Sequence, residues 1–396
     1  MNKKLIQLLL TRYWKGLSAI AGLIIAANLF FTITSVKEWQ SVQQLADRPE
    51  NERQSLNFSP DENGQYELYF DDTTNSTVMT DDYTTFRDQR LQFFNTRTPR
   101  WQDSRGLKTN QSDYYSESPL FFVAISIITG FSLFFFDLKT NFNTLLFSSS
   151  FSKKQLYWHK HLLVGGTLGL SFIAGKIVTI LILLGGIPSH YFNGTLGMLI
   201  NSSLSTVFIF LTIYAISSFI GLLLGEWISG VMTILGFWLS FMAFTNGFTE
   251  LFTLFNRHIL GKTVNDSDYF VVNPINQWLF ELNNISAPVS VFIVLSAVFI
   301  STLIMGLYWF KQASLENNGQ YLLFDSLRQP VLVFFLFYTL IATNASQWIS
   351  EERQIGLLLL QAILTLMIAY LIGRLTIYRR INIGKKSSLG VQGDLH

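Results

Sequence analysis

Apolar residues come in long blocks along this chain, and polar segments of very different lengths separate them. A bilayer core about 30 Å thick requires roughly 20 mostly apolar residues in a helix. We therefore predict an all-α polytopic membrane protein. Eight blocks reach or approach the required length, and each is a predicted membrane-spanning helix: residues 17–36, 120–136, 162–187, 196–224, 227–248, 289–310, 331–348 and 355–372.

The composition agrees with a chain that lies largely in lipid. Of its 396 residues, 49% are hydrophobic and only 14% are charged, whereas a soluble domain carries about 25% charged residues. The chain contains no cysteine, which excludes disulfides, thiolate metal sites and cysteine nucleophiles. The apolar run after the basic residues 1–15 is too long for a signal-peptide core, so we expect it to remain as the first span.

Basic residues indicate how the spans are oriented, because Lys and Arg accumulate in short cytoplasmic loops. With a cytoplasmic N-terminus, the inner segments contain 15 Lys or Arg and the short outer loops contain 3. Both termini are therefore predicted to be cytoplasmic. The inner segments are residues 1–16, 137–161, 225–226, 311–330 and 373–396, and the outer loops are residues 188–195, 249–288 and 349–354.

Two long polar segments lie outside the predicted spans. Residues 65–70 alternate like a strand and residues 83–94 can form a short amphipathic helix, so a small extracytoplasmic α/β domain is predicted between the first two spans. Residues 249–287 contain two apolar pieces too short to span, which we place at the outer interface or as re-entrant segments. The predicted parts are the N-terminal segment with the first span (1–36), the external domain (37–118), spans two to six (119–310), a cytoplasmic linker (311–330), spans seven and eight (331–373) and a basic tail that contacts membrane lipid (374–396).

The loop between the second and third spans, residues 138–160, is the most informative inner segment. Ser152 followed by Gln155 is a capping box, which predicts a helix that starts at Lys153 and continues into the third span. An ordinary basic loop with an interfacial helix explains these features as well as a docking element does. The loop also carries an apolar cluster formed by Leu145, Leu146 and Phe147.

The same residues resemble a loop of ABC exporter permeases of the second type. In that family a leucine pair precedes Ser-x-Pro-x-Ser-Arg, and a lysine follows as the next helix enters the membrane. Here the usual proline is Ser150, the usual arginine is Lys153, and the later lysine is Lys160. The resemblance implies a coupling helix that is seated on a cytoplasmic ATPase and contacts it through Leu145, Leu146, Phe147, Ser152, Lys153 and Lys154.

A second segment resembles the same family. Residues 315–324 with Pro330 are similar to the pattern Glu-x-x-Gly-x-x-x-x-Phe…Pro of a bacterial subgroup with two extra C-terminal helices. The resemblance implies a pair of permease subunits, identical or related, in the bacterial cell membrane. It also implies separate ATPase subunits that bind ATP and Mg, with no cofactor on this chain and no nucleic acid as a partner.

A search for catalytic or metal-binding residues finds no convincing site. Residues 260–263 look like the tail of a phosphate-binding loop, but the glycine that this loop needs five residues before Gly261 is Asn256. His159 and His161 face away from each other on a helix, without an acid at ligand spacing. Interfacial or solvated histidines are the simpler interpretation. We therefore predict that this chain is not itself an enzyme.

Lys176 is the one strongly charged residue well inside a predicted span, where an unpartnered charge costs several kcal/mol. It either lines a translocation path and binds an anionic group, or extends its stem toward the outer surface. Asn201 and Ser205 on the fourth span lie at comparable depth, as path residues or as ordinary helix-packing residues. Glu226, in the tight turn between the fourth and fifth spans, is a candidate gating residue or a solvated helix end.

The function predicted from these features is the permease subunit of an ATP-driven exporter that moves a peptide, a lipid-linked molecule or a drug. The alternative is a membrane sensor or resistance module whose external domain binds a peptide or partner without transport. An enzyme for lipid-linked substrates is a third hypothesis, which lacks clustered His, Asp or Glu at a membrane face. A neighbouring gene for an ATPase would favour the first hypothesis, and one for a sensor kinase the second.

Overall fold

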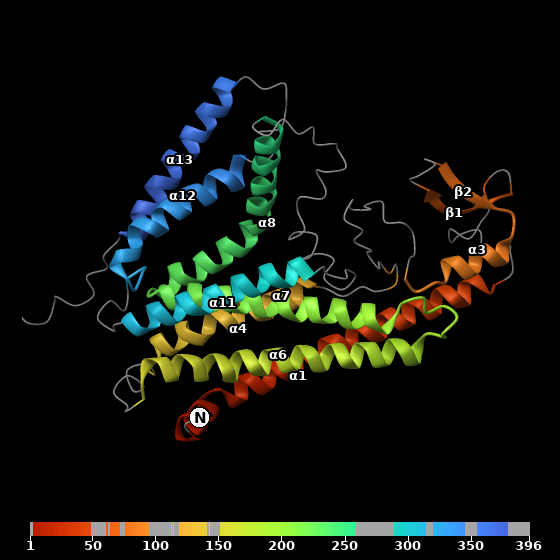
Figure 1. Ribbon diagram of the computed structural model, residues 1–396, viewed down its shortest axis with the longest axis horizontal. Helices are drawn as coiled ribbons and strands as arrows, with labels where there is room; N and C mark the ends of the chain where they lie inside the picture. The colour runs from red at the N-terminus through yellow and green to blue at the C-terminus, as the bar shows by residue number, and fades with distance from the viewer. Residues whose placement is uncertain are drawn as a thin grey trace, which may run out of the picture. The chain divides into compact units, whose positions relative to one another are not determined.

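The computed structural model describes residues 3–48, 64–71, 76–94, 119–140, 151–258, 289–313, 320–344 and 355–378, with the single positions 61, 112, 114 and 142. Figure 1 follows these residues along the chain. The helices are α1 (Lys3–Ala46), α3 (Tyr83–Arg90), α4 (Pro119–Lys139), α6 (Lys153–Gly186), α7 (Leu196–Leu223), α8 (Trp227–His258), α11 (Val289–Gln312), the 3-10 helix η1 (Asp325–Leu327), α12 (Arg328–Asn344) and α13 (Ile355–Ile377). The strands are β1 (Tyr66–Asp71) and β2 (Ser76–Thr80).

Seven helices in the described part are long and apolar enough to cross a membrane: α1, α4, α6, α7, α11, α12 and α13. They coincide with seven of the eight predicted spans. The helices α7, α11 and α13 start at the predicted residues 196, 289 and 355. The described residues therefore have the architecture of a helical, polytopic membrane protein.

The fifth predicted span lies in α8, a continuous helix of 32 residues. Among the described side chains, its apolar part is the shorter run Ile228–Phe241. α8 continues to His258, so the first apolar piece of the predicted outer segment 249–287 is the end of this helix. That the two apolar pieces lie at the outer interface or re-enter the membrane stays a prediction, and the second piece lies outside the described residues.

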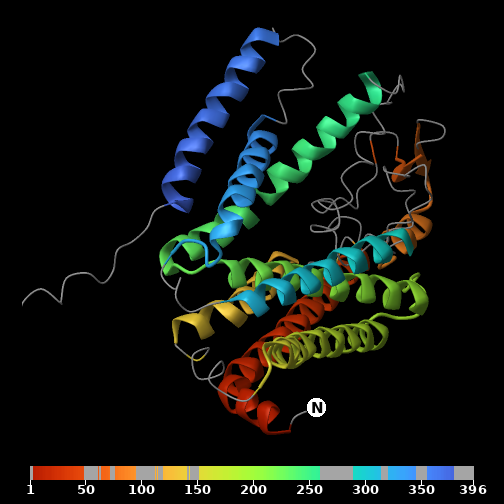
Figure 2. The same ribbon diagram turned by 60° about the vertical axis from the view of Figure 1, so that its left-hand side comes forward.

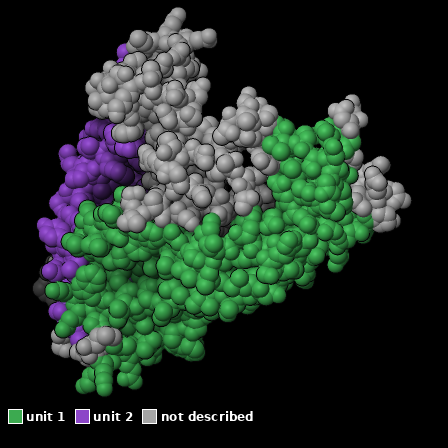
Figure 3. Space-filling view, turned by 45° about the vertical axis from the view of Figure 1, so that its right-hand side comes forward, with its two compact units in different colours: residues 1–130, 154–217, 263–305 green, residues 131–153, 218–262, 306–396 purple. Residues whose placement is uncertain are grey.

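The described chain forms two compact units, which Figure 3 shows in different colours. Unit 1 comprises residues 1–130, 154–217 and 263–305, and unit 2 comprises residues 131–153, 218–262 and 306–396.

In unit 1, α1 and α6 run side by side in the same direction (Figures 1 and 2). A Cβ added to Gly175 would lie 2.6 Å from Nδ2 of Asn28. One turn further along both helices, the hydroxyl oxygens of Thr32 and Thr179 are 3.0 Å apart. Two parallel helices that cross a membrane need a third helix to return the chain between them, and α4 lies between them in the sequence.

α7 runs antiparallel to α6 in the same unit. The ring centroids of Phe172 and Phe210 are 4.7 Å apart, and Leu183 and Leu199 belong to one buried cluster. Rising numbers in α6 therefore pair with falling numbers in α7. This is the arrangement of two successive membrane crossings joined by a short loop.

α4 and α7 run parallel and approach each other closely. The ring of Phe122 lies 5.8 Å from that of Phe210, and a Cβ added to Gly130 would lie only 2.3 Å from the carbonyl oxygen of Tyr214. Small residues allow helix backbones to approach in this way in membrane proteins. Position 130 therefore has no room for a larger residue.

We expect Gly130→Ala to destabilise the protein by about 1–3 kcal/mol, because the added methyl group would overlap the backbone of α7 and push the helices apart. Gly166→Ala is the matched control, since a Cβ at position 166 meets nothing within 4 Å. Thermal unfolding of both purified variants in the same detergent measures the difference. Equal melting temperatures would contradict the close approach at Gly130.

The strand and the short helix predicted within residues 37–118 are both present. β1 and β2 form an antiparallel hairpin, and α3 packs on it, with the ring of Phe86 stacked 4.9 Å from that of Tyr66. α1 passes the predicted domain boundary at residue 36 and runs to Ala46, which is buried in the same apolar cluster. We call residues 64–94 the hairpin subdomain.

In unit 2, α12 contacts both α8 and α13. Thr233 lies 2.9 Å from the Tyr321 hydroxyl and Ser240 lies 2.9 Å from the Tyr338 hydroxyl. α8 and α12 are therefore parallel. Gly373, near the end of α13, packs against side chains in the first turns of α12, so α12 and α13 are antiparallel.

Candidate functional site

Four segments of unit 2 meet where α7 ends and α8 begins. They are Lys153 at the start of α6, the turn of residues 224–226, the last turn of α11, and residues 320–327 before α12. We call this assembly the helix-end junction. It includes residues from two regions that the sequence singled out, the loop 138–160 and the turn at Glu226.

Residues 320–327 pair with the turn like a short piece of β-sheet. The backbone N–H of Leu323 donates to the carbonyl oxygen of Leu223 at 2.9 Å, next to an antiparallel bridge between Leu224 and Leu322. The last carbonyls of a helix have no partner within the helix. Leu323 supplies one of these partners, so the pairing fixes residues 320–327 on the end of α7.

An apolar cluster stabilises this pairing. The ring of Phe324, which is buried, lies 4.9 Å from the ring of Trp309 on α11. Phe324 is also the last residue of the sequence segment 315–324, and the structure places it in a core. The cluster consists of Leu223, Trp309, Ala313, Leu323, Phe324 and Leu327.

Lys153 joins the start of α6 to the end of α11. Its Nζ atom donates to the carbonyl oxygens of Lys311 at 3.1 Å and of Ala313 at 2.8 Å. The C-terminal end of a helix carries partial negative charge and unsatisfied carbonyls. An ammonium group is therefore stabilised at this position. α6 begins at Lys153, as predicted.

Glu226 immediately precedes α8. The Ser229 hydroxyl donates to its carboxylate, and the backbone N–H of Gly230 donates to its carbonyl oxygen at 3.0 Å. An acidic side chain is favourable at the N-terminal end of a helix. These contacts explain the position of Glu226 immediately before α8. Its gating role stays a prediction.

Arg328, the first residue of α12, adds polar contacts to the junction. Its Nη2 atom lies 2.6 Å from a carboxylate oxygen of Asp325 and 2.5 Å from Oε1 of Gln320. The side chain is only 10% exposed. Arg328 therefore ties residues 320–327 to the helix that follows them.

Lys176 is buried within unit 1, with 5% of its surface exposed. Its neighbours Gly175 and Thr179 contact Asn28 and Thr32 of α1. The structure thus places the side chain inside the bundle of α1, α6 and α7 and not along its surface.

The polar side chains of α1 and α7 that lie about level with Lys176 have used their donors within their own helices. The Thr32 hydroxyl donates to the carbonyl oxygen of Asn28 at 2.7 Å, and the Asn28 amide donates to a carbonyl one turn earlier at 2.8 Å. The Thr206 hydroxyl of α7 donates to the backbone carbonyl oxygen of Ser202 at 2.7 Å. Among the described residues, Oδ1 of Asn28 is buried without a hydrogen-bond partner. Because these donors are used within their own helices, the lone pairs around them suit a cationic group better than an anionic one.

Ser205 and Asn201 differ in their relation to Lys176. The antiparallel register in which Phe172 lies opposite Phe210 puts Ser205 about level with Lys176. Ser205 is buried, whereas Asn201 lies further along α7 and is half-buried. The structure therefore brings Ser205 to the depth of Lys176 and places Asn201 beyond it.

His161 is buried, with 7% of its surface exposed, so the expectation of an interfacial or solvated ring was wrong. Its Nδ1 atom is 3.1 Å from the Tyr214 hydroxyl, and its ring lies edge-on to that of Tyr157 at 4.5 Å. The reason is that α6 packs against other helices from its second turn onward. In the ranges that the structure describes, no three His, Cys, Asp or Glu side chains lie close enough together to hold a metal ion.

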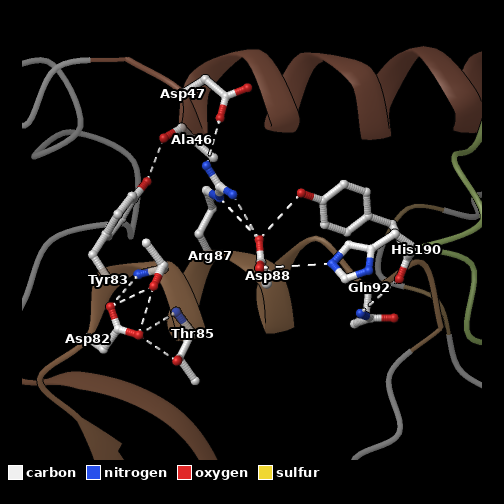
Figure 4. A network of polar contacts seen from close by, with 11 residues as sticks. Ala46, Asp47, Asp82, Tyr83, Thr85, Arg87, Asp88, Gln92 and His190 are labelled. Carbon is white, nitrogen blue, oxygen red and sulfur yellow. Dashed lines mark hydrogen bonds and ion pairs between the residues drawn. The ribbon is translucent and has the colours of Figure 1, made fainter.

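Polar contacts fix the hairpin subdomain to α1 and to the loop after α6 (Figure 4). The Asp88 carboxylate accepts hydrogen bonds from Arg87 at 3.0 Å and from the Tyr191 hydroxyl at 3.4 Å, and the His190 ring is 3.9 Å away. Arg87 also lies 3.4 Å from Asp47, which follows α1. One charged network thus joins three separate segments of unit 1.

Further contacts hold α3 in place beside α1. Hydrogen bonds from the side chains of Thr85 and Thr84 lower the pKa of Asp82, the residue before α3, to about 2. The indole N–H of Trp39 on α1 donates to the carbonyl oxygen of Leu91 at 2.8 Å. The hairpin subdomain is therefore a folded part of unit 1.

The apolar cluster of the predicted coupling helix, Leu145, Leu146 and Phe147, lies outside the described residues. Ser152 and Lys154 flank Lys153 and are exposed. Lys160, which follows them in the same pattern, is completely buried. Its burial was not predictable from the loop pattern, because it depends on which face of α6 packs.

No protein-family model matches the chain, and no similarity to a curated protein or to a solved structure was found. The resemblance to exporter permeases therefore depends on the sequence alone, chiefly on residues 145–160 and 315–330.

Proposed function

We propose that this chain is the membrane-spanning subunit of an ATP-driven exporter of the ABC type, with ATP hydrolysis on a separate subunit. The position of α6 is the observation that carries the proposal. α6 begins at Lys153, directly after the predicted docking loop, and continues unbroken for 34 residues to Gly186. A partner that displaces the loop would therefore move one rigid helix about 50 Å long. The cargo is a peptide, a lipid-linked molecule or a drug-like compound.

The helix-end junction supports eight spans, with both termini on the cytoplasmic side of a bacterial cell membrane. Leu224 and Leu322 pair with each other, so the chain between them must cross the membrane an even number of times. α11 lies in this stretch and is long and apolar enough to cross. α8, which also lies in this stretch, would supply the second crossing, and the absence of charged residues between Glu226 and Glu250 in the sequence is compatible with that role.

The topology is tested with single cysteines, because the natural chain has none. Ser116→Cys and Asp266→Cys should react with a membrane-impermeant thiol reagent in intact cells. Ser387→Cys should react only after the cells are opened. Labelling of Ser387→Cys in intact cells would contradict a cytoplasmic C-terminus.

The exporter function is tested by purifying the tagged full-length chain from its native host in mild detergent. We expect an ATPase subunit with a phosphate-binding loop to co-purify in a fixed ratio. Reconstitution of this complex should give ATP hydrolysis that a transported cargo stimulates. Isolation of the chain with a sensor kinase and no ATPase would contradict the proposal.

The contacts of the hairpin subdomain favour a second candidate, a membrane sensor. The Asp88 network and Trp39 connect this subdomain directly to α1, so a ligand bound there would act on a helix that enters the membrane. A sensor needs no ATPase, and the composition of the purified complex distinguishes the two functions.

A further inference from the structure

The contact between Lys153 and α11 joins two segments that lie far apart in the sequence. The ammonium group donates to the carbonyl oxygen of Lys311 in the last turn of α11 and to that of Ala313, the residue after the helix. Both acceptors belong to the helix end where the backbone carries partial negative charge. Charge-assisted hydrogen bonds of this kind are roughly twice as strong as neutral ones.

The contact also reaches the rest of the helix-end junction. Ala313 is buried in the cluster that contains Leu323 and Phe324. Leu323 in turn bonds to the end of α7 through Leu223. A continuous set of contacts therefore connects Lys153 with the end of α11, with the turn before α8 and with the segment that leads into α12.

We infer that Lys153 is a positioning residue, through which a displacement of the loop 138–152 is delivered to α11 and to the start of α12. α6 also contacts α11 through the Tyr157 hydroxyl, which donates to the carbonyl oxygen of Leu303 at 2.9 Å, whereas Lys153 contacts the end of α11. This inference rests on the proposed exporter function, because it assumes that an ATPase moves the loop.

The neighbouring lysine provides a control for the contact. Lys154 has the same charge and is exposed, but it points about 100° away from Lys153 around α6. Lys153→Arg is the conservative variant, since it retains a cation and several N–H donors. Lys153→Met keeps the length of the stem and removes the charge and the donors.

The contact itself is tested by hydrogen exchange on the full-length chain in lipid nanodiscs, without the ATPase. In Lys153→Met, exchange of the backbone amides in the last turn of α11 should become roughly tenfold faster, because local opening of the helix end becomes easier. Lys154→Met should leave these exchange rates unchanged, and Lys153→Arg should restore most of the protection. Unchanged exchange in Lys153→Met would overturn the inference.

The role in coupling is tested on the reconstituted complex by the amount of cargo moved for each ATP hydrolysed. This ratio should fall at least fivefold in Lys153→Met and recover in Lys153→Arg. Faster exchange with an unchanged ratio would make the contact merely structural and would overturn the positioning role. If the wild-type chain has no ATPase partner, the exporter function fails and the coupling role fails with it, while the exchange experiment still decides whether the contact exists.

Discussion

We expect replacement of both Leu146 and Phe147 by Asp to release the proposed ATPase subunit from the purified complex. Each of these side chains, if fully buried in a groove of the partner, contributes about 1.5–3 kcal/mol to binding. Their joint loss would weaken binding by roughly a hundredfold or more, because every 1.4 kcal/mol corresponds to a factor of about ten. Quantitative co-purification at equal expression measures the effect.

Asn141→Asp together with Asn143→Asp is the matched control. It adds two negative charges to the same loop and removes no apolar side chain, so the ATPase should remain bound. If the variant with Asp at positions 146 and 147 still carried the ATPase at the wild-type ratio, the loop would not be the docking element. Loss of the ATPase in both variants would instead point to charge repulsion as the cause.

If the proposed exporter function holds and Lys176 takes part in it, we expect Lys176→Met to reduce cargo-stimulated ATP hydrolysis by about tenfold or more, since a hydrogen bond to a charged group is worth about 1.5–3 kcal/mol. The side chain is buried, and its ammonium group is a cation with three N–H donors. Met has a stem of similar length, so insertion and assembly should persist. Stimulated hydrolysis and transport are measured on the same proteoliposomes.

Lys37→Met serves as the control, because Lys37 also lies on a long helix but is exposed. It should leave stimulated hydrolysis unchanged. If Lys176→Met behaved like Lys37→Met, the buried charge would have no part in moving the cargo. A lower melting temperature without any loss of transport would assign Lys176 to packing alone.

The sequence predicted the spans closely because charged and helix-terminating residues mark where apolar blocks end. It was less successful where a helix leaves the bilayer. A hydropathy pattern marks the part of a helix that can lie in lipid and not the full length of that helix. The predicted domain boundary after residue 36 therefore lies inside α1. α1 continues because Trp39 and Ala46 are buried against the hairpin subdomain and residues 188–194. α8 likewise continues past residue 248, where the fifth predicted span ends, to His258.

The candidate site was only partly predictable. The capping box correctly predicted that α6 starts at Lys153, since a cap is a local property of the chain. The partner of Lys153 is a pair of backbone carbonyls more than 150 residues away, and every residue type offers a backbone carbonyl. The burial of His161 likewise depends on how α6 packs, which a pattern of two neighbouring histidines does not contain.

The bridge between Leu224 and Leu322 also has a consequence for the biogenesis of the protein. Its two residues are separated in the sequence by α8 and α11, so the bridge can close only after the ribosome has synthesised both helices. Until then the end of α7 lacks the N–H group of Leu323. Closure of the bridge therefore places the segment that leads into α12 at the end of α7 only once α8 and α11 have brought Leu224 and Leu322 together.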